Sequence, residues 1–117
     1  MKTSKNKGRI YLEQGCDLYE EGRHHEAFLA FQSAAKLGNP QAQVNLANLY
    51  DAGEGVNQDR KYAAYWYKRA ANKEIPEAAY NLAISYEQQG KTKWAQFWFK
   101  RASEMGDEDA MEGRRMR

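Results

Sequence analysis

The stretch AQVNLANLY at residues 42–50 recurs, with changes, as AAYNLAISY at residues 78–86. A second motif, AAYWYKRAA at residues 63–71, is similar to AFLAFQSAA at residues 27–35 and to AQFWFKRAS at residues 95–103. Self-similarity at a spacing of roughly 20–50 residues is typical of repeat proteins. The residues shared by the first pair at an offset of 36 are Ala42, Asn45, Leu46, Ala47 and Tyr50. The 117-residue chain therefore predicts three tandem units of two segments each.

Each segment has the residue spacing of an amphipathic helix. Ala63, Tyr67, Ala70 and Ala71 fall at i, i+4, i+7 and i+8, which places them on one helical face. The sequence predicts helices at residues 9–21, 24–37, 40–52, 59–73, 76–89 and 91–105. The expected fold class is all-α, with three helical hairpins, six main helices and a short C-terminal piece in a right-handed α-α superhelix.

Residue types at the helix ends agree with these ranges. Asn39 and Asp59 are suited to cap the N-termini of the third and fourth helices, and Pro40 fits a first helical turn. Gly38 and Gly106 follow second helices, where a left-handed residue commonly ends a helix. These residues predict short turns between packed helices.

A single helical hairpin cannot bury both of its apolar faces, so neighbouring hairpins must cover them. We expect small residues where the two helices of a hairpin approach closely and large ones in the gaps between hairpins. The small residues are Gly15, Ala47 and Ala83, and the large ones are Phe31, Tyr67 and Phe99.

The second unit carries the turn LYDAGEGVNQD at residues 49–59, followed by the motif at residues 63–71. This combination of a Tyr, a Gly-x-Gly-Val turn, an Asp and Ala-x-x-Trp-Tyr-x-x-Ala-Ala resembles the SEL-one-like repeat. The turns at residues 21–23 and 89–91 are shorter and resemble the related tetratricopeptide repeat. The resemblance covers about residues 8–112. It implies a binding scaffold or adaptor without a shared active site.

Charge is distributed unevenly along the chain. The net charge is +2, but Lys2, Lys5, Lys7, Arg9 and three arginines in residues 114–117 lie at the ends, so the part between them is acidic. Nucleic-acid binding needs cations clustered on the folded part, and we therefore expect no nucleic-acid partner. The expected organisation is a disordered basic N-terminus at 1–8, a solenoid at 9–106, and a partial capping helix with a basic tail at 107–117.

Several classes of site are disfavoured by the sequence. Cys16 is the only cysteine, which excludes an internal disulfide and a cysteine-based zinc site. His24 and His25 diverge by about 100° on a helix, so they would chelate one metal poorly. We expect no enzyme activity, no catalytic residues, no metal and no cofactor. No run approaches the roughly 20 apolar residues of a membrane span. No signal peptide is recognisable, and we expect the cytoplasm, or the periplasm if a signal was removed.

The resemblance implies that the first helix of each unit lines a concave face that binds another protein or a peptide. We expect a groove with an apolar middle and an acidic side near Glu20, which favours basic residues in the partner. The alternative is that Leu12, Val44 and Ile84 pack against the neighbouring hairpin. The groove residues predicted are Leu12, Cys16, Tyr19, Val44, Asn48, Asp51, Tyr80, Ile84 and Glu87.

Two further sets of residues are candidates for binding. Asn45 and Asn81 occupy equivalent positions and could clamp a peptide backbone, or bond to a neighbouring loop. Trp94 and Phe97 lie in the last hairpin, where no fourth unit follows to bury them. Residues 107–117, a second copy of the chain in a homodimer, or a partner could cover them.

The sequence therefore predicts a non-enzymatic protein-interaction module or adaptor. Its size also permits a bacterial inhibitor or immunity-type protein, although no residue selects that role. The alternative is a structural subunit that self-assembles through its aromatic C-terminal hairpin.

Overall fold

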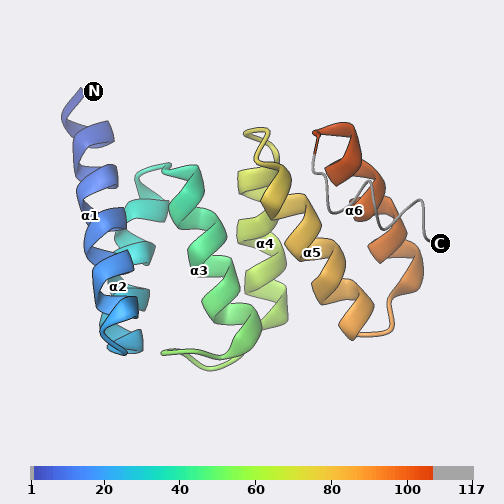
Figure 1. Cartoon of the computed structure of the whole chain (residues 1–117), viewed down its shortest axis with the longest axis horizontal. Coiled ribbons are helices and arrows are strands. Elements are labelled where there is room, and N and C mark those ends of the chain that lie inside the picture. Colours follow the sequence, from blue (N-terminus) through green and yellow to red (C-terminus); the bar gives the residue numbers. More distant parts are fainter. Residues whose placement is uncertain (1, 107–117) are drawn as a thin grey trace. The chain divides into compact units, whose positions relative to one another are not determined.

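The computed structural model describes residues 2–106, with side chains from residue 6 onward. Within that range the chain forms six helices and no strand (Figure 1), which confirms the predicted all-α class. Five of the six helices have bounds within two residues of those predicted. The helices are α1 (Lys2–Glu20), α2 (His24–Lys36), α3 (Pro40–Ala52), α4 (Arg60–Ala71), α5 (Pro76–Gln88) and α6 (Thr92–Glu104).

The start of α1 differs from the prediction. A disordered segment was expected over residues 1–8, but the helix already begins at Lys2. Gly8 is buried, and a Cβ atom built on it would lie 3.6 Å from Asn39 Cβ and 3.9 Å from Leu37 Cβ. The α1 backbone at Gly8 therefore lies against the link between α2 and α3. The predicted capping helix and tail at 107–117 lie outside the described residues.

Side-chain caps fix two of the helix starts. The Asn39 side chain accepts a hydrogen bond from the Ala42 N–H at 2.9 Å, as its position before α3 predicts. The Asp59 carboxylate accepts one from the Tyr62 N–H at 3.0 Å at the start of α4. Both predicted caps are confirmed.

The second helix of each hairpin ends in a left-handed residue. Gly38 after α2 and Gly106 after α6 have φ angles of +90° and +94°. Glu74 takes the corresponding place after α4 with a φ of +61°. A side chain in this conformation costs about 1–2 kcal/mol, so the middle repeat ends less favourably than the other two.

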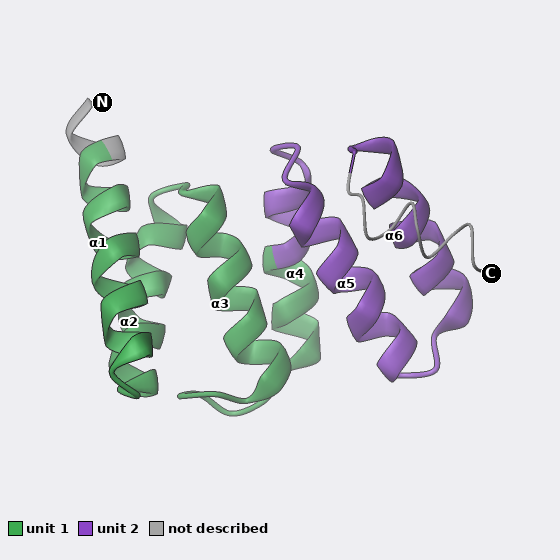
Figure 2. Cartoon of the chain, in the orientation of Figure 1, with its two compact units in different colours: residues 1–66 green, residues 67–117 purple. Residues whose placement is uncertain are grey.

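The chain divides into two compact units, residues 1–66 (unit 1) and residues 67–117 (unit 2), shown in Figure 2. In unit 1, α1 packs on α2 and α2 packs on α3; in unit 2, α5 packs on α6. The core of unit 1 comes from the facing sides of α2 and α3. Its buried members are Ala27, Phe28, Phe31, Ala34, Ala35, Ala42, Leu46 and Leu49.

Gly15 lies at a close approach of α1 and α2, as predicted, but Phe31, expected in the gap between hairpins, meets it there. Gly15 of α1 is buried, and a Cβ atom on it would lie 2.5 Å from the Phe31 ring. The glycine therefore lets the ring rest directly on the α1 backbone. Phe31 is only 3% exposed, and burial of such a side chain stabilises the fold by about 1.5–3 kcal/mol. This gain exceeds the roughly 1 kcal/mol that a helical glycine costs relative to alanine.

Candidate functional site

Unit 1 contains a cavity of about 300 Å³ between α1 and α3. Its volume lies at the lower end of the roughly 300–1,000 Å³ range of small-molecule sites, so one or two inserted side chains would fill it. The residues that line it are Cys16, Tyr19, Glu20, Phe31, Asn45, Asn48, Leu49 and Glu54.

The floor of this unit 1 cavity is apolar because of the contact between Gly15 and Phe31. The Phe31 ring reaches the cavity from α2 by lying against the α1 backbone at Gly15. Leu49 of α3, which is also buried, adds to the apolar lining. Such a floor suits the methylene stem or ring of an incoming side chain.

One wall of the cavity comes from the long turn between α3 and α4. The Tyr19 hydroxyl donates a hydrogen bond to Glu54 Oε1 at 3.0 Å. This bond, more than burial, raises the pKa of the Tyr19 phenol. The His24 ring stacks on the Tyr19 ring with centroids 4.8 Å apart, and its Nδ1 lies 3.9 Å from Glu54 Oε2. Glu54 is thereby tied to residues of α1 and α2.

Gly55 explains how the long turn reaches α2. His25 Nδ1 is hydrogen-bonded to the Gly55 carbonyl oxygen at 2.8 Å. A Cβ atom on Gly55 would lie 2.3 Å from the His24 carbonyl oxygen and 2.7 Å from the His25 backbone nitrogen. The glycine, with a φ of +71°, thus permits backbone contact between the turn and the start of α2, and this contact brings Glu54 to the cavity.

The cavity is acidic. Of the described residues, its lining includes the carboxylates of Glu20 and Glu54 and no lysine, arginine or histidine. Burial raises the pKa of the Cys16 thiol, and the charges of Asp17 and Glu20 raise it further. A thiol reacts as its thiolate, so this environment keeps Cys16 protonated and unreactive near neutral pH. The same negative potential favours a cationic group from outside.

Four of the predicted residues line the cavity together: Cys16, Tyr19, Asn45 and Asn48. Glu54 also lines the cavity, although the sequence predicts it only as part of a turn. The signal for it is the Gly-x-Gly pattern, whose glycines let the turn fold back onto α2. The pattern alone does not show that the residue between the glycines meets Tyr19.

Three of the predicted groove residues have other roles. Val44 is 0% exposed, so it cannot contact a partner and the packing alternative is correct for it. Leu12 packs on the core of unit 1 and lines a different hollow, near Gly8 and Pro40. Asp51 pairs with Arg60 at 3.6 Å. Its carbonyl oxygen also accepts a hydrogen bond from Gln58 at 2.7 Å, so Asp51 holds the long turn together.

The remaining predicted groove residues belong to unit 2. Tyr80 is half-buried, and its ring meets the edge of Phe99 at 5.7 Å. Ile84 and Asn81 are half-buried and Glu87 is exposed. Their part in binding, and that of Asn45 and Asn81 as a clamp, stays a prediction.

The described part of the chain offers no group of three or more histidine, cysteine, aspartate or glutamate side chains that could hold a metal ion. None of its helices combines the length and the apolarity needed to cross a membrane.

Comparison with known proteins places the chain among repeat proteins. The model of the Sel1 repeat matches residues 40–74 and 76–107. The chain is 37% identical over 68 residues to the chitin synthase regulator SKT5 of Saccharomyces cerevisiae. The match covers 58% of this chain and 10% of the regulator, so the chain spans about a tenth of that relative's length.

Solved structures confirm the predicted solenoid fold class. A Sel1 repeat protein from Oxalobacter formigenes is 29% identical, with a TM-score of 0.73 over 90% of this chain and 46% of the other. The first tetratricopeptide domain of Spaghetti (RPAP3), bound to an HSP90 peptide, has a TM-score of 0.78 and 18% identity, covering 96% of this chain and 90% of that one. The second likeness concerns the fold alone.

Proposed function

Because the chain belongs to the Sel1 repeat family, we propose that it is a non-enzymatic module that binds a segment of another protein in the unit 1 cavity. Repeats of the Sel1 and tetratricopeptide types generally mediate protein–protein interaction. The RPAP3 domain holds a peptide on the same fold. The similar yeast protein is a regulator of chitin synthase, which supports a role exerted through another protein.

The observation that carries the proposal is the combination of an apolar floor and an acidic rim in one cavity. Phe31 and Leu49 offer apolar surface, while Glu20 and Glu54 bring carboxylates without a cation in the lining. A lysine or arginine of the partner matches this arrangement, with its stem on the floor and its charge at a carboxylate. Asn45 and Asn48 add amide groups that can bond to the partner's backbone.

Adaptor and inhibitor roles differ only in what the bound partner then does, so both rest on the same binding event.

To test binding in the unit 1 cavity, a random peptide library displayed on phage is selected on the full chain. We expect the enriched peptides to carry a lysine or arginine beside apolar residues. A doubly substituted chain, Glu20→Gln with Glu54→Gln, should bind them at least tenfold more weakly, since each charged hydrogen bond contributes about 1.5–3 kcal/mol.

Glu77→Gln is the matched control, because Glu77 is an exposed carboxylate of α5 that does not line the cavity. It should leave binding unchanged. Enriched peptides without basic residues, or equal binding by the doubly substituted chain, would show that the unit 1 cavity is not the recognition site.

A further inference from the structure

Unit 2 has its own cavity, of about 430 Å³, between α4 and α6. Trp94 and Phe97 are 57% and 55% exposed there, although they are among the largest apolar side chains of the molecule. Exposed apolar groups bordered by polar ones mark interaction surfaces. The residues lining the unit 2 cavity are Lys68, Lys93, Trp94, Phe97 and Trp98.

The repeat equivalents of Trp94 and Phe97 on α2 show whether a neighbouring repeat would bury these positions. Leu29 of α2 is the repeat equivalent of Phe97, and it is 47% exposed even though α3 packs on α2. The position on α2 that does face the next repeat is Phe28, whose ring meets Tyr50 of α3 at 5.3 Å. Its equivalent in α6 is Gln96. The side of α6 that corresponds to the α3-facing side of α2 therefore carries the polar Gln96. Trp94 and Phe97 lie on a different side of α6, the one equivalent to the exposed side of α2 with Glu26 and Leu29, which we call the outer face.

The exposed rings are held in place by their neighbours. The Trp94 ring meets the edge of Tyr86 of α5 at 5.4 Å, and Lys68 Nζ lies 5.8 Å from its centroid. Phe97 meets the edge of Trp98 at 5.3 Å. Rings that are already positioned lose little freedom on binding, which makes them suitable anchors.

The unit 2 cavity is basic. Among the residues that the structure describes, Lys68 and Lys93 line it and no carboxylate does. Arg101 follows Trp94 and Phe97 at helical spacing, so it extends the same face of α6. A ligand for this surface must bring negative charge and apolar area together.

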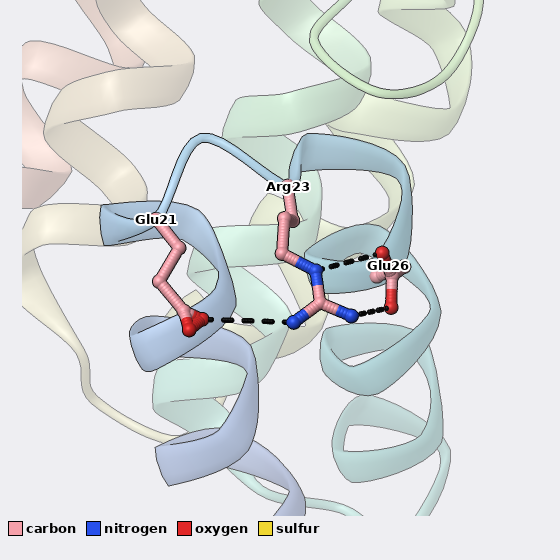
Figure 3. Close-up of polar contacts among 3 residues, drawn as sticks. All are labelled: Glu21, Arg23 and Glu26. Atoms are coloured by element: carbon pink, nitrogen blue, oxygen red, sulfur yellow. Dashed lines mark hydrogen bonds and ion pairs between the residues drawn. The ribbon is translucent and has the colours of Figure 1, made fainter.

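The corresponding face of α2 is different. Glu26 is the repeat equivalent of Trp94, and Figure 3 shows it bonded twice to Arg23. One bond runs from Arg23 Nε to Glu26 Oε1 at 2.9 Å, and Glu21 lies 3.8 Å from the same guanidinium. The Glu26 carboxylate of α2 is therefore paired within the chain, whereas the equivalent position of α6 presents an aromatic ring beside lysines.

We propose that the unit 2 cavity binds an acidic segment of another protein. A carboxylate of the segment lies near Lys68 and Lys93, and a neighbouring apolar side chain rests on Trp94 and Phe97. The exposed rings lie beside two lysines, so one short segment can place an apolar side chain and a carboxylate on this surface together. The ligand charge is opposite to that expected at the unit 1 cavity, so the two sites can be tested separately.

The test uses the full chain and a fluorescein-labelled peptide in which a leucine is flanked by glutamates, together with a twin that has lysines in place of the glutamates. Fluorescence anisotropy should show binding of the acidic peptide and at least tenfold weaker binding of its twin. Trp94→Ala and Lys68→Glu should each weaken binding of the acidic peptide at least tenfold. Leu29→Ala is the control, because Leu29 is the repeat equivalent of Phe97 on α2. It should not alter binding of the acidic peptide.

Other occupants would give distinct results. Absence of binding, or binding unaffected by Trp94→Ala and Lys68→Glu, would overturn the proposal. Tighter peptide binding after neutralisation of Asp107, Glu108 and Asp109 would identify the chain's own acidic stretch as the occupant instead. A concentration-dependent dimer that excludes the peptide would identify a second copy, and capture by anionic phospholipid vesicles through Trp94 would identify a membrane surface.

Discussion

The helices α2 and α6 hold the same place in their hairpins but differ in what surrounds their first turn. Both follow a short turn with a left-handed glycine, Gly22 and Gly90, at φ angles of +80° and +75°. After the turn, Arg23 bonds to Glu26 on α2, whereas Lys91 lies over the Tyr86 ring at 5.8 Å before α6. The same backbone thus carries an ion pair in one repeat and a cation–aromatic contact in the other.

A second difference concerns the turn that packs on the start of α2 and has no counterpart at the start of α6 among residues 2–106. The long turn with Glu54 and Gly55 packs on the start of α2 and adds a carboxylate to the unit 1 cavity. Within residues 2–106, no such turn covers the start of α6, where Trp94 stays exposed. The comparison teaches that the hairpin provides the scaffold, while the turn that docks on it determines the charge and closure of the neighbouring surface.

The largest change in stability is expected when a buried aromatic residue of α2 is replaced, compared with an exposed one of α6. Phe31→Ala should lower the free energy of unfolding by about 3–5 kcal/mol, because it leaves a cavity in the core of unit 1. Phe97→Ala should change it by no more than about 1 kcal/mol, since this ring is exposed and loses mainly its edge contact with Trp98. Urea unfolding followed by circular dichroism measures both. Equal losses would mean that Phe97 belongs to the core and not to a binding surface.

A smaller difference in stability is expected between glycine substitutions in the long turn before α4 and in the short turn before α6. Gly55→Ala should cost about 2–4 kcal/mol, because its Cβ atom would overlap the backbone of His24 and His25 and the residue has a positive φ. Gly90→Ala meets nothing within 4 Å, so only backbone strain of about 1 kcal/mol is expected. Urea unfolding of the two variants, compared by their midpoints, measures this difference.

Gly55→Ala should also weaken the binding of basic peptides, since it displaces Glu54, while Gly90→Ala should not. If both variants unfold at the same urea concentration, the docking of the long turn contributes nothing to stability.

The helices could be predicted from the sequence because their signals are local. Caps such as Asn39 and Asp59 act within one turn, and the spacing of alanines and aromatics fixes the buried face. The close approach at Gly15 was also predictable, since the repeat places a small residue there, but the partner was not: Phe31 was expected in the gap between hairpins and its ring lies on Gly15 within the first hairpin. The early start of α1 was missed because Gly8 packs on the link between α2 and α3, which is distant in sequence.

The cavity was predicted only in part because its walls come from different repeats. Cys16 and Tyr19 are on the expected face of α1, and Asn48 is on that of α3. Val44 was placed on the same surface from its helical position, but neighbouring packing buries it completely. Glu54 could not be recognised, because its role depends on where the turn of seven residues between α3 and α4, 53–59, folds back. Such contacts are tertiary and leave no periodic signal.

The smallest effect is expected from the ion pair before α2. The hydrogen bond from Arg23 lowers the pKa of the Glu26 carboxyl; burial opposes this shift, and the charges of Arg23 and His25 lower the pKa further. A carboxyl whose pKa is lower in the folded chain stabilises that chain above its unfolded pKa. The contribution is lost as the pH falls through the folded pKa. Both side chains are exposed, so the change in the unfolding midpoint should be slight.

An NMR titration therefore measures this effect better than unfolding does. Glu26 should titrate below the ordinary range of a glutamate, and Arg23→Gln should bring its pKa back toward that range. Lys91→Gln is the control from the equivalent turn, and it should leave the Glu26 titration unchanged because Lys91 contacts a ring and not this carboxylate. If Glu26 titrates identically with and without Arg23, the pair does not persist in solution. The outer face of α2 would then be open to cationic partners.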